Sequence, residues 1–191
     1  MQKGASFVRE FNVDNKFGTD VCVYLASIFP NIYTLGMSSY SVHLLHYLFN
    51  QRPEILCDRF FYPMETTTNE YPGQNKKNIS ANRSKLGSTF GTPRQRLNSY
   101  GHNLPLTDFE VLSFTLQYEL DYPNVLYFLS QIDAPLYTDQ RITASDLKQG
   151  FLRNPLIIAG GPCVRSNPLP MAPFIDFFYT GDLEVILDKF L

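Results

Sequence analysis

A stretch near the N-terminus, residues 20–47, most constrains how this chain can fold. Its first half, Val21–Ile28, is an apolar run rich in β-branched residues, which predicts a buried strand. From Met37 onward, apolar residues recur with the 3.6-residue period of a helix, and a turn ending in Gly36 joins the two elements. A strand, a glycine turn and a helix N-terminus place backbone N–H groups at the carboxyl edge of a sheet. Because α/β proteins bind ligands at that edge, we expect the chemistry of this chain there.

Strand and helix patterns alternate along the rest of the chain. Four further apolar runs predict strands at Ile55–Tyr62, Phe109–Leu116, Leu156–Ala159 and Asp176–Thr180. Helices are expected after Ser38 or Ser39, whose hydroxyl would cap the first turn, from Asp121 to about Asp133, over one or two turns at 143–147, and after Asp182. The crossovers are long enough for parallel strands. The pattern therefore predicts an α/β fold, a flavodoxin-like, doubly wound and mostly parallel sheet of about five strands.

The length of the chain and the uneven distribution of polar residues along it predict its domain organisation. Its 191 residues suit one domain at 20–191, preceded by a lead-in segment at 1–19. Residues 63–105 are polar, lack a period and are too long for an ordinary connection, so they are expected to form an insertion. Six Lys and Arg residues lie at 74–96 without an acidic residue. Such a segment is compatible with nucleic acid or phosphate binding, but a solvated surface loop is the simpler interpretation.

Composition gives no sign of a membrane or of secretion. The chain is 44% hydrophobic with a formal net charge of −2, and it has no apolar run long enough to span a bilayer. We therefore expect a cytoplasmic protein without membrane contact. The spacing of the cysteines matches no zinc or iron–sulfur pattern. Cys22 and Cys57 are expected to be buried thiols, whereas Cys163 would be either a reactive thiol at the ligand edge or a small apolar filler.

Five loop motifs together carry a resemblance to a known family. They are Pro30-Asn31-Ile32-Tyr33-Thr34-Leu35-Gly36-Met37-Ser38, Phe114-Thr115-Leu116-Gln117-Tyr118-Glu119-Leu120, Ile158-Ala159-Gly160-Gly161-Pro162-Cys163, Asn167-Pro168, and Tyr179-Thr180-Gly181-Asp182 with Glu184. In order and spacing they resemble the N-terminal cobalamin-binding-like domain of a family of cobalamin-dependent radical SAM proteins, over roughly residues 18–190. The resemblance implies a Rossmann-like domain that binds the corrin ring over the strand carboxyl ends and buries the nucleotide tail in the sheet.

The candidate cofactor-binding residues follow from the same edge and from this resemblance. They are Asn31, Tyr33, Gly36, Met37, Ser38, Thr115, Gln117, Gly160, Gly161 and Gly181. Tyr33 occupies the place of the histidine that ligates cobalt from below in D-x-H-x-x-G domains. A neutral phenol is a poor cobalt ligand, so the corrin would bind without a lower histidine. Thr115 and Gln117 would hydrogen-bond the nucleotide tail, and the glycines would clear its floor.

Other polar residues have simpler interpretations. Glu119 and Asp121 form a carboxylate pair that suggests acid–base catalysis, but helix capping explains Asp121 more simply. His43 and His46 lie one helical turn apart, yet no third metal ligand is in view. They are therefore interpreted as histidines at the surface or the edge of the core. His102 is expected in a loop without an assigned role.

The chain carries no C-x-x-x-C-x-x-C triplet, which a radical SAM barrel needs to hold a 4Fe-4S cluster with S-adenosylmethionine. No catalysis is expected from this chain alone, and a barrel would be supplied in cis or in trans. Two functions stay open: a cobalamin-binding module of a radical SAM enzyme, or a degenerate interaction domain in which Tyr33 and neighbouring aromatic residues fill the crevice. A flavin or other nucleotide in the same crevice rests on fold analogy alone.

Overall fold

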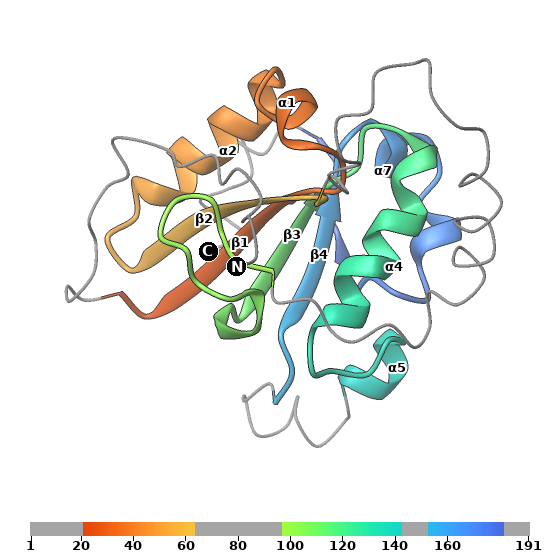
Figure 1. Ribbon diagram of the computed structural model, residues 1–191. Helices are drawn as coiled ribbons and strands as arrows, with labels where there is room; N and C mark the ends of the chain where they lie inside the picture. Colours follow the sequence, from red (N-terminus) through yellow and green to blue (C-terminus); the bar gives the residue numbers. More distant parts are fainter. Residues whose placement is uncertain (1–20, 64–96, 143–152, 182–191) are drawn as a thin grey trace, which may run out of the picture.

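The computed structural model of the chain describes residues 21–63, 97–142 and 153–181, which form a five-stranded parallel sheet with helices on both faces (Figure 1). The strand order is β2-β1-β3-β4-β5, and every neighbouring pair is parallel. The strands are β1 (Val23–Phe29), β2 (Ile55–Phe61), β3 (Val111–Thr115), β4 (Leu156–Gly160) and β5 (Phe177–Phe178). This arrangement confirms the predicted flavodoxin-like α/β fold.

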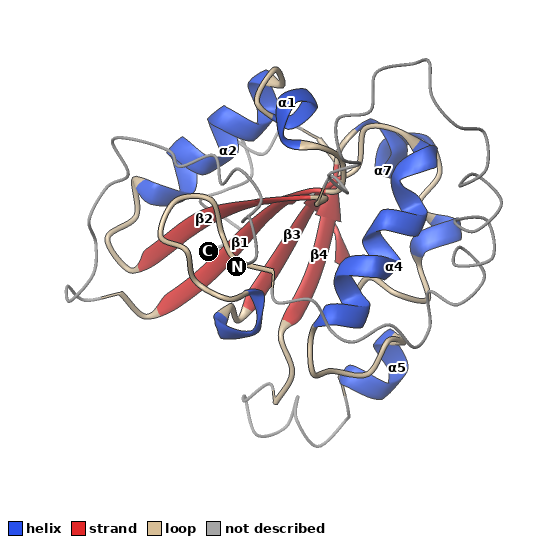
Figure 2. Ribbon diagram, viewed as in Figure 1, coloured by secondary structure: helices blue, strands red, loops and turns tan. Residues whose placement is uncertain are grey.

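Two longer helices cover opposite faces of the sheet (Figure 2). Helix α2 (Tyr40–Asn50) packs Leu45 and Phe49 against β1 and β2, whereas α4 (Tyr122–Gln131) packs Val125 and Phe128 against the other face. The shorter helices are α1 (Tyr33–Gly36), α5 (Thr138–Arg141) and α7 (Pro162–Ser166), and the 3-10 turns are η1 (Leu106–Asp108), η2 (Glu119–Asp121) and η3 (Leu169–Met171). Helices on both faces explain why most strand residues are buried.

The strand predictions agree with the structure to within two residues at every end, and β5 differs most in length. It is two residues long, where five were expected. Helix α2 begins at Tyr40 rather than Met37, because the chain first forms the short helix α1 and a turn. Several predictions lie outside the described residues. They concern the lead-in segment, the helices expected at 143–147 and after Asp182, and residues 64–96 of the predicted insertion.

Two local predictions were wrong. Cys22 precedes β1 and is exposed, because the strand begins one residue later, whereas Cys57 is buried as expected. Ser39 is the N-cap residue of α2, but its hydroxyl makes no capping hydrogen bond to the helix backbone. It bonds to other side chains at the carboxyl edge of the sheet instead.

Residues 97–109 cover part of the sheet that no described helix reaches. Leu106 and Phe109 are buried in the same core cluster as α4, and the Phe109 ring meets the Phe60 ring edge-on at 5.1 Å. The Ser99 and Leu106 amides donate to the Leu104 and Leu97 carbonyls, so the segment folds back on itself. The last part of the predicted insertion is therefore packed on β1 and β2, as Figure 1 shows in green.

A buried ion pair fixes the segment before β5. The guanidinium of Arg141, which is 1% exposed, donates to both carboxylate oxygens of Asp176 and to the carbonyls of Pro135, Leu136 and Phe174. The Asp176 carboxylate also accepts the backbone N–H of Ile157 at 2.8 Å. Since the charges of both partners are compensated inside the protein, this pair ties α5 to the end of the sheet.

Replacing Arg141 by Met is expected to lower the free energy of unfolding by about 3–5 kcal/mol, because the Asp176 carboxylate then stays buried without its partner. Urea denaturation at neutral pH measures the change. The control is the exposed Arg165, whose replacement by Met is expected to change stability by less than about 0.5 kcal/mol. Equal stability of the two variants would contradict the assigned role of Arg141.

Within the described ranges, the structure contains no helix long and apolar enough to cross a membrane.

Candidate functional site

The ten predicted site residues all lie in or just after the carboxyl ends of four strands. Those from Asn31 to Ser38 follow β1, and Gly181 follows β5. Thr115 is the last residue of β3 and Gln117 lies just after it, whereas Gly160 is the last residue of β4 and Gly161 follows it. The structure therefore brings them to one edge of the sheet. Their roles in binding a cofactor stay predictions, and the contacts of each side chain indicate what that edge can hold.

Asn31 lies just after β1, at the point of the sheet where the crossover helices change from one face to the other. Its Nδ2 donates to Asp121 Oδ1 at 2.7 Å, and its Oδ1 accepts the Ile32 amide at 2.8 Å. Beside it, Asn124 Nδ2 donates to the Pro30 carbonyl. The loop after β1 is thus held against the start of α4 by protein–protein hydrogen bonds.

Asp121 is a buried carboxyl group, and the prediction that it caps a helix was wrong. It stands at the N-cap position of α4, but its side chain makes no capping hydrogen bond and is 2% exposed. Its Oδ2 has no partner among the described residues. Burial raises the pKa of Asp121, and the hydrogen bond from Asn31 offsets this only in part.

Gln117 joins the loop after β3 to the N-terminus of α2. Its Nε2 lies 2.9 Å from Ser39 Oγ and 3.2 Å from Ser41 Oγ. Ser38, nearer the solvent, donates its hydroxyl to the Leu35 carbonyl. The groups predicted to bind a nucleotide tail or a corrin are therefore used to connect one loop with another.

Tyr33 takes part in an aromatic cluster and does not stand alone in the crevice. Its ring stacks on Tyr100 at 4.9 Å and meets Phe61 edge-on at 5.1 Å. Met37 packs against the same cluster. Gly36 serves this packing too, because a Cβ at that position would lie 2.2 Å from a ring carbon of Phe61.

Small residues lie side by side on the α2 face of the sheet, near its carboxyl edge. We call Ser27, Ser113, Thr115 and Gly160 the floor of this edge. Ser27 is opposite Ser113 in the register of β1 and β3, and Thr115 is opposite Gly160 in that of β3 and β4. The ring of Tyr179 lies on this floor, since a Cβ on Gly160 would be 1.9 Å from one of its carbons. Gly160 thus makes room for a side chain of the protein itself.

The phenol of Tyr179 faces the hydroxyl groups of this floor. Burial raises the pKa of Tyr179, and the nearby Ser113 and Thr115 hydroxyls partly offset that shift. Ser113 Oγ nevertheless has no hydrogen-bond partner within the described ranges, so its contact with the phenol is electrostatic rather than a well-aligned hydrogen bond.

Gly161 and Cys163 shape the turn after β4. Gly161 has a φ of +108°, and a Cβ there would lie 2.6 Å from the Leu116 carbonyl oxygen, so glycine is required on both grounds. Cys163 lies in α7 rather than in a loop and is 4% exposed. Burial and the negative charges of Glu119 and Asp121 raise the pKa of its thiol, which favours the interpretation as an apolar filler over that as a nucleophile.

Replacing Asp121 by Asn is expected to stabilise the protein relative to wild type increasingly as the pH rises. The raised pKa means that the folded state prefers the neutral carboxyl. Its stabilising effect is complete below the usual pKa of an aspartate and is lost as the pH passes through the raised value. Asn keeps the acceptor for Asn31 and cannot ionise.

The stability difference between wild type and the Asp121→Asn variant is measured by thermal unfolding at about every pH unit between roughly pH 3 and pH 8. The exposed Asp108 provides the control, because its replacement by Asn should give a small difference without that trend. If wild type became more stable relative to the Asp121→Asn variant as the pH rises, the raised pKa of Asp121 would be contradicted.

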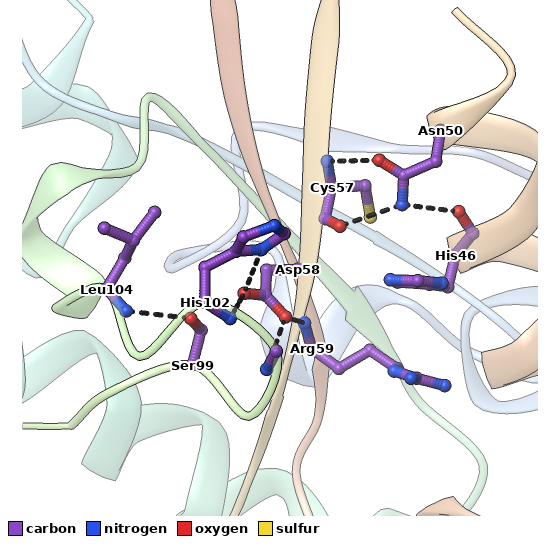
Figure 3. A network of polar contacts seen from close by, with 9 residues as sticks. His46, Asn50, Cys57, Asp58, Arg59, Ser99, His102 and Leu104 are labelled. Atoms are coloured by element: carbon purple, nitrogen blue, oxygen red, sulfur yellow. Dashed lines mark hydrogen bonds and ion pairs between the residues drawn. The ribbon is translucent and has the colours of Figure 1, made fainter. Parts of the chain in front are cut away.

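A second polar network, which the sequence analysis missed, lies at β2 (Figure 3). The Asp58 carboxylate is 0% exposed and accepts the amides of Arg59, Gly101 and His102, and His102 Nδ1 lies 3.0 Å from Asp58 Oδ2. Ser99 adds a further side-chain hydrogen bond. His102, to which no role was assigned, therefore anchors residues 97–105 to the sheet. No local sequence pattern links the two residues, which are 44 positions apart.

Opposing effects set the pKa of Asp58. Burial alone raises it, but the hydrogen bonds from His102, Ser99 and the backbone amides outweigh burial and hold the pKa below its usual value. The ionised carboxylate is therefore the form that the folded protein stabilises.

The free edge of β2 is closed by neighbouring groups. Asn50, at the end of α2, uses its side-chain amide to bond both the N–H and the C=O of Cys57. Two residues further, the Arg59 carbonyl accepts the Tyr100 amide at 3.0 Å. Figure 3 shows the Asn50 bonds beside the Asp58 network.

Replacing Asp58 by Asn is expected to cost about 3 kcal/mol at neutral pH, because an amide NH2 then faces backbone N–H donors in a buried site. A lowered pKa contributes stability above the usual aspartate pKa, and this contribution is lost as the pH falls through the lowered value. The advantage of wild type over the variant should therefore shrink in acid. Urea denaturation at several pH values measures it, with the exposed Asp139 replaced by Asn as the control. A constant difference at all pH values would refute the ionised Asp58.

His43 lies next to groups of the protein itself. His43 Nε2 lies 2.9 Å from the Met37 carbonyl, and its Nδ1 lies 3.5 Å from an Arg59 nitrogen. In the part of the chain that the structure describes, no three His, Cys, Asp or Glu side chains come together to hold a metal ion. The interpretation of these histidines as surface and edge residues is consistent with the exposure of His43 and the partial burial of His46.

Comparison with known proteins identifies the class to which this fold and edge belong. The family described as radical SAM proteins, N-terminal, matches residues 88–191, which is more than half of the chain. The chain therefore belongs to the family of radical SAM N-terminal domains.

One relative is the uncharacterized protein MJ0966 of Methanocaldococcus jannaschii. It is 33% identical over 79 residues, which make up 41% of this chain and 14% of that protein. The match thus spans a small part of a much longer protein. No solved structure matches this chain significantly.

The family match confirms the predicted resemblance to a radical SAM N-terminal domain. Radical SAM enzymes in general use S-adenosylmethionine and a 4Fe-4S cluster. The cysteines of this chain lie in separate segments, just before β1, within β2 and in α7. The described residues therefore offer no ligand set for such a cluster.

Proposed function

We propose that this chain is the non-catalytic N-terminal module of a radical SAM enzyme, with the fold of a cobalamin domain but with its own side chains where the nucleotide tail would lie. Family membership supports the first part. The second part rests on one observation. The Tyr179 ring lies directly on Gly160, on the floor that a buried nucleotide tail would occupy.

The neighbouring polar groups support the same proposal. Gln117 bonds Ser39 and Ser41, and Asn31 bonds Asp121, so the side chains that would hold a ligand are already paired. Each would have to exchange an internal hydrogen bond for one to the ligand, with little net gain. The residues of this edge therefore do not fit a corrin whose tail enters the sheet.

The position of Tyr33 adds an argument about cobalt. Its ring is packed between Tyr100 and Phe61, so it is directed into the protein rather than toward a metal above the strands. Of the two functions that the sequence left open, the degenerate interaction domain fits these contacts better.

The test is to mix the purified chain with hydroxocobalamin, remove the free ligand by gel filtration and record the visible spectrum of the protein peak. We expect a colourless peak. A protein with a D-x-H-x-x-G loop serves as the positive control for retention. The same experiment on the gene product that contains the barrel examines whether the barrel holds the corrin from its upper face.

A corrin that comes off the column with this chain would overturn the proposal and favour the cobalamin-binding alternative. In that case, replacing Tyr179 by Ala should strengthen retention, because it removes the ring from above Gly160. Replacing the exposed Tyr137, which stacks on Phe174 away from this floor, should leave it unchanged.

A further inference from the structure

The carboxyl edge of the sheet carries large apolar side chains that face the solvent. Leu35, Tyr40, Tyr118 and Leu120 are 48%, 77%, 57% and 90% exposed. Leu35 follows β1, Tyr40 begins α2, and the other two follow β3. Exposed Leu and Tyr are ordinary one at a time, but a group of them at one edge is typical of an interaction surface.

The hydrogen bonds described above join the loops that carry these side chains. Gln117 bonds the residues on both sides of Tyr40, and Tyr118 is its neighbour in the chain. The Ser38 hydroxyl fixes the Leu35 carbonyl to the same turn. These bonds thus join the two loops. We call the four exposed side chains, Leu35, Tyr40, Tyr118 and Leu120, the apolar rim.

We propose that the apolar rim is the surface on which the radical SAM barrel docks, an inference that rests on the proposed function. The described relative extends far beyond the matched segment, and the family is the N-terminal part of radical SAM proteins. The last described strand, β5, also has its carboxyl end at this edge. The rim would meet the barrel directly, without a corrin between them.

The charge of the rim favours this occupant over a second copy of the chain. Residues 30–41 and 116–123 contain no Lys or Arg, and Glu119 is their exposed acidic side chain. In a symmetric dimer, Glu119 would approach its own copy, which costs free energy. A barrel surface with apolar side chains and a basic residue at the margin would complement the rim.

Helix α2 offers a matched pair of substitutions. Tyr40 and Tyr47 are both exposed, and their seven-residue spacing puts them on the same side of the helix, about 10 Å apart along its axis. Tyr40 is at the carboxyl edge of the sheet and Tyr47 is two turns away from it. Glu is tolerated at both, since neither side chain is part of the core.

The experiment measures amide hydrogen exchange of the loops at 33–41 and 116–122, in this chain alone and in the presence of its barrel on the same or a separate polypeptide. We expect the barrel to slow exchange there by about tenfold or more. Tyr40→Glu and Leu120→Glu should each return exchange toward the rate of the chain alone, whereas Tyr47→Glu should keep the protection. Exchange of the sheet strands in each variant verifies that the fold is intact.

Unchanged exchange on adding the barrel would overturn the docking proposal, as would equal effects of Tyr40→Glu and Tyr47→Glu. A dimer of the chain alone that Tyr40→Glu dissociates, seen by light scattering, would assign the rim to a second copy. Retention of cobalamin in the spectroscopic test bears on the proposed function separately. The failure of one proposal can therefore be distinguished from the failure of the other.

Discussion

An all-parallel sheet needs cover on both faces, and most of this structure follows from how the chain supplies it. Helices α2 and α4 cover the centre, but the described helices leave the α4 face of β1 and β2 and the region before β5 to irregular segments. In both places a buried carboxylate holds the irregular segment. The Asp58 carboxylate accepts hydrogen bonds from the turn around His102, and the Asp176 carboxylate accepts them from the Arg141 guanidinium. Charge-assisted hydrogen bonds thus replace the apolar stripe of a helix, at the cost of burying a charge.

The fold was accessible from the sequence because its signals are local. Each buried strand is a short apolar run, and the α2 and α4 segments show helical periodicity, so the element order and the parallel topology could be predicted. The two anchors could not, since nothing in the local pattern pairs Asp58 with His102 or Arg141 with Asp176. Such pairs depend on contacts across 44 and 35 residues, which one sequence does not reveal.

The candidate site was predicted in its place but not in its contacts. Parallel strands bring their carboxyl ends together whatever the side chains are, so the residues after β1, β3 and β4 could be assigned to one edge. Whether a Gly or Gln at this edge contacts a ligand or another residue depends on which side chains lie next to it in the folded protein. Tyr179 was visible in a motif, yet only the structure places its ring over Gly160. The family match supports a radical SAM context for this chain, and the structure shows that Asn31 and Gln117 are paired with other residues of the same edge.

The closed edge of β2 restricts how this module can meet other polypeptides. The Asn50 side chain occupies the N–H and C=O of Cys57, and Tyr100 occupies the carbonyl of Arg59, so β2 presents no open ladder there to an incoming strand. Edge strands left open are templates for aggregation and for strand addition. A partner that approaches β2 must therefore recognise side chains instead of backbone. At Cys57 and Arg59, β2 is thus protected from edge-to-edge pairing with another copy of the sheet.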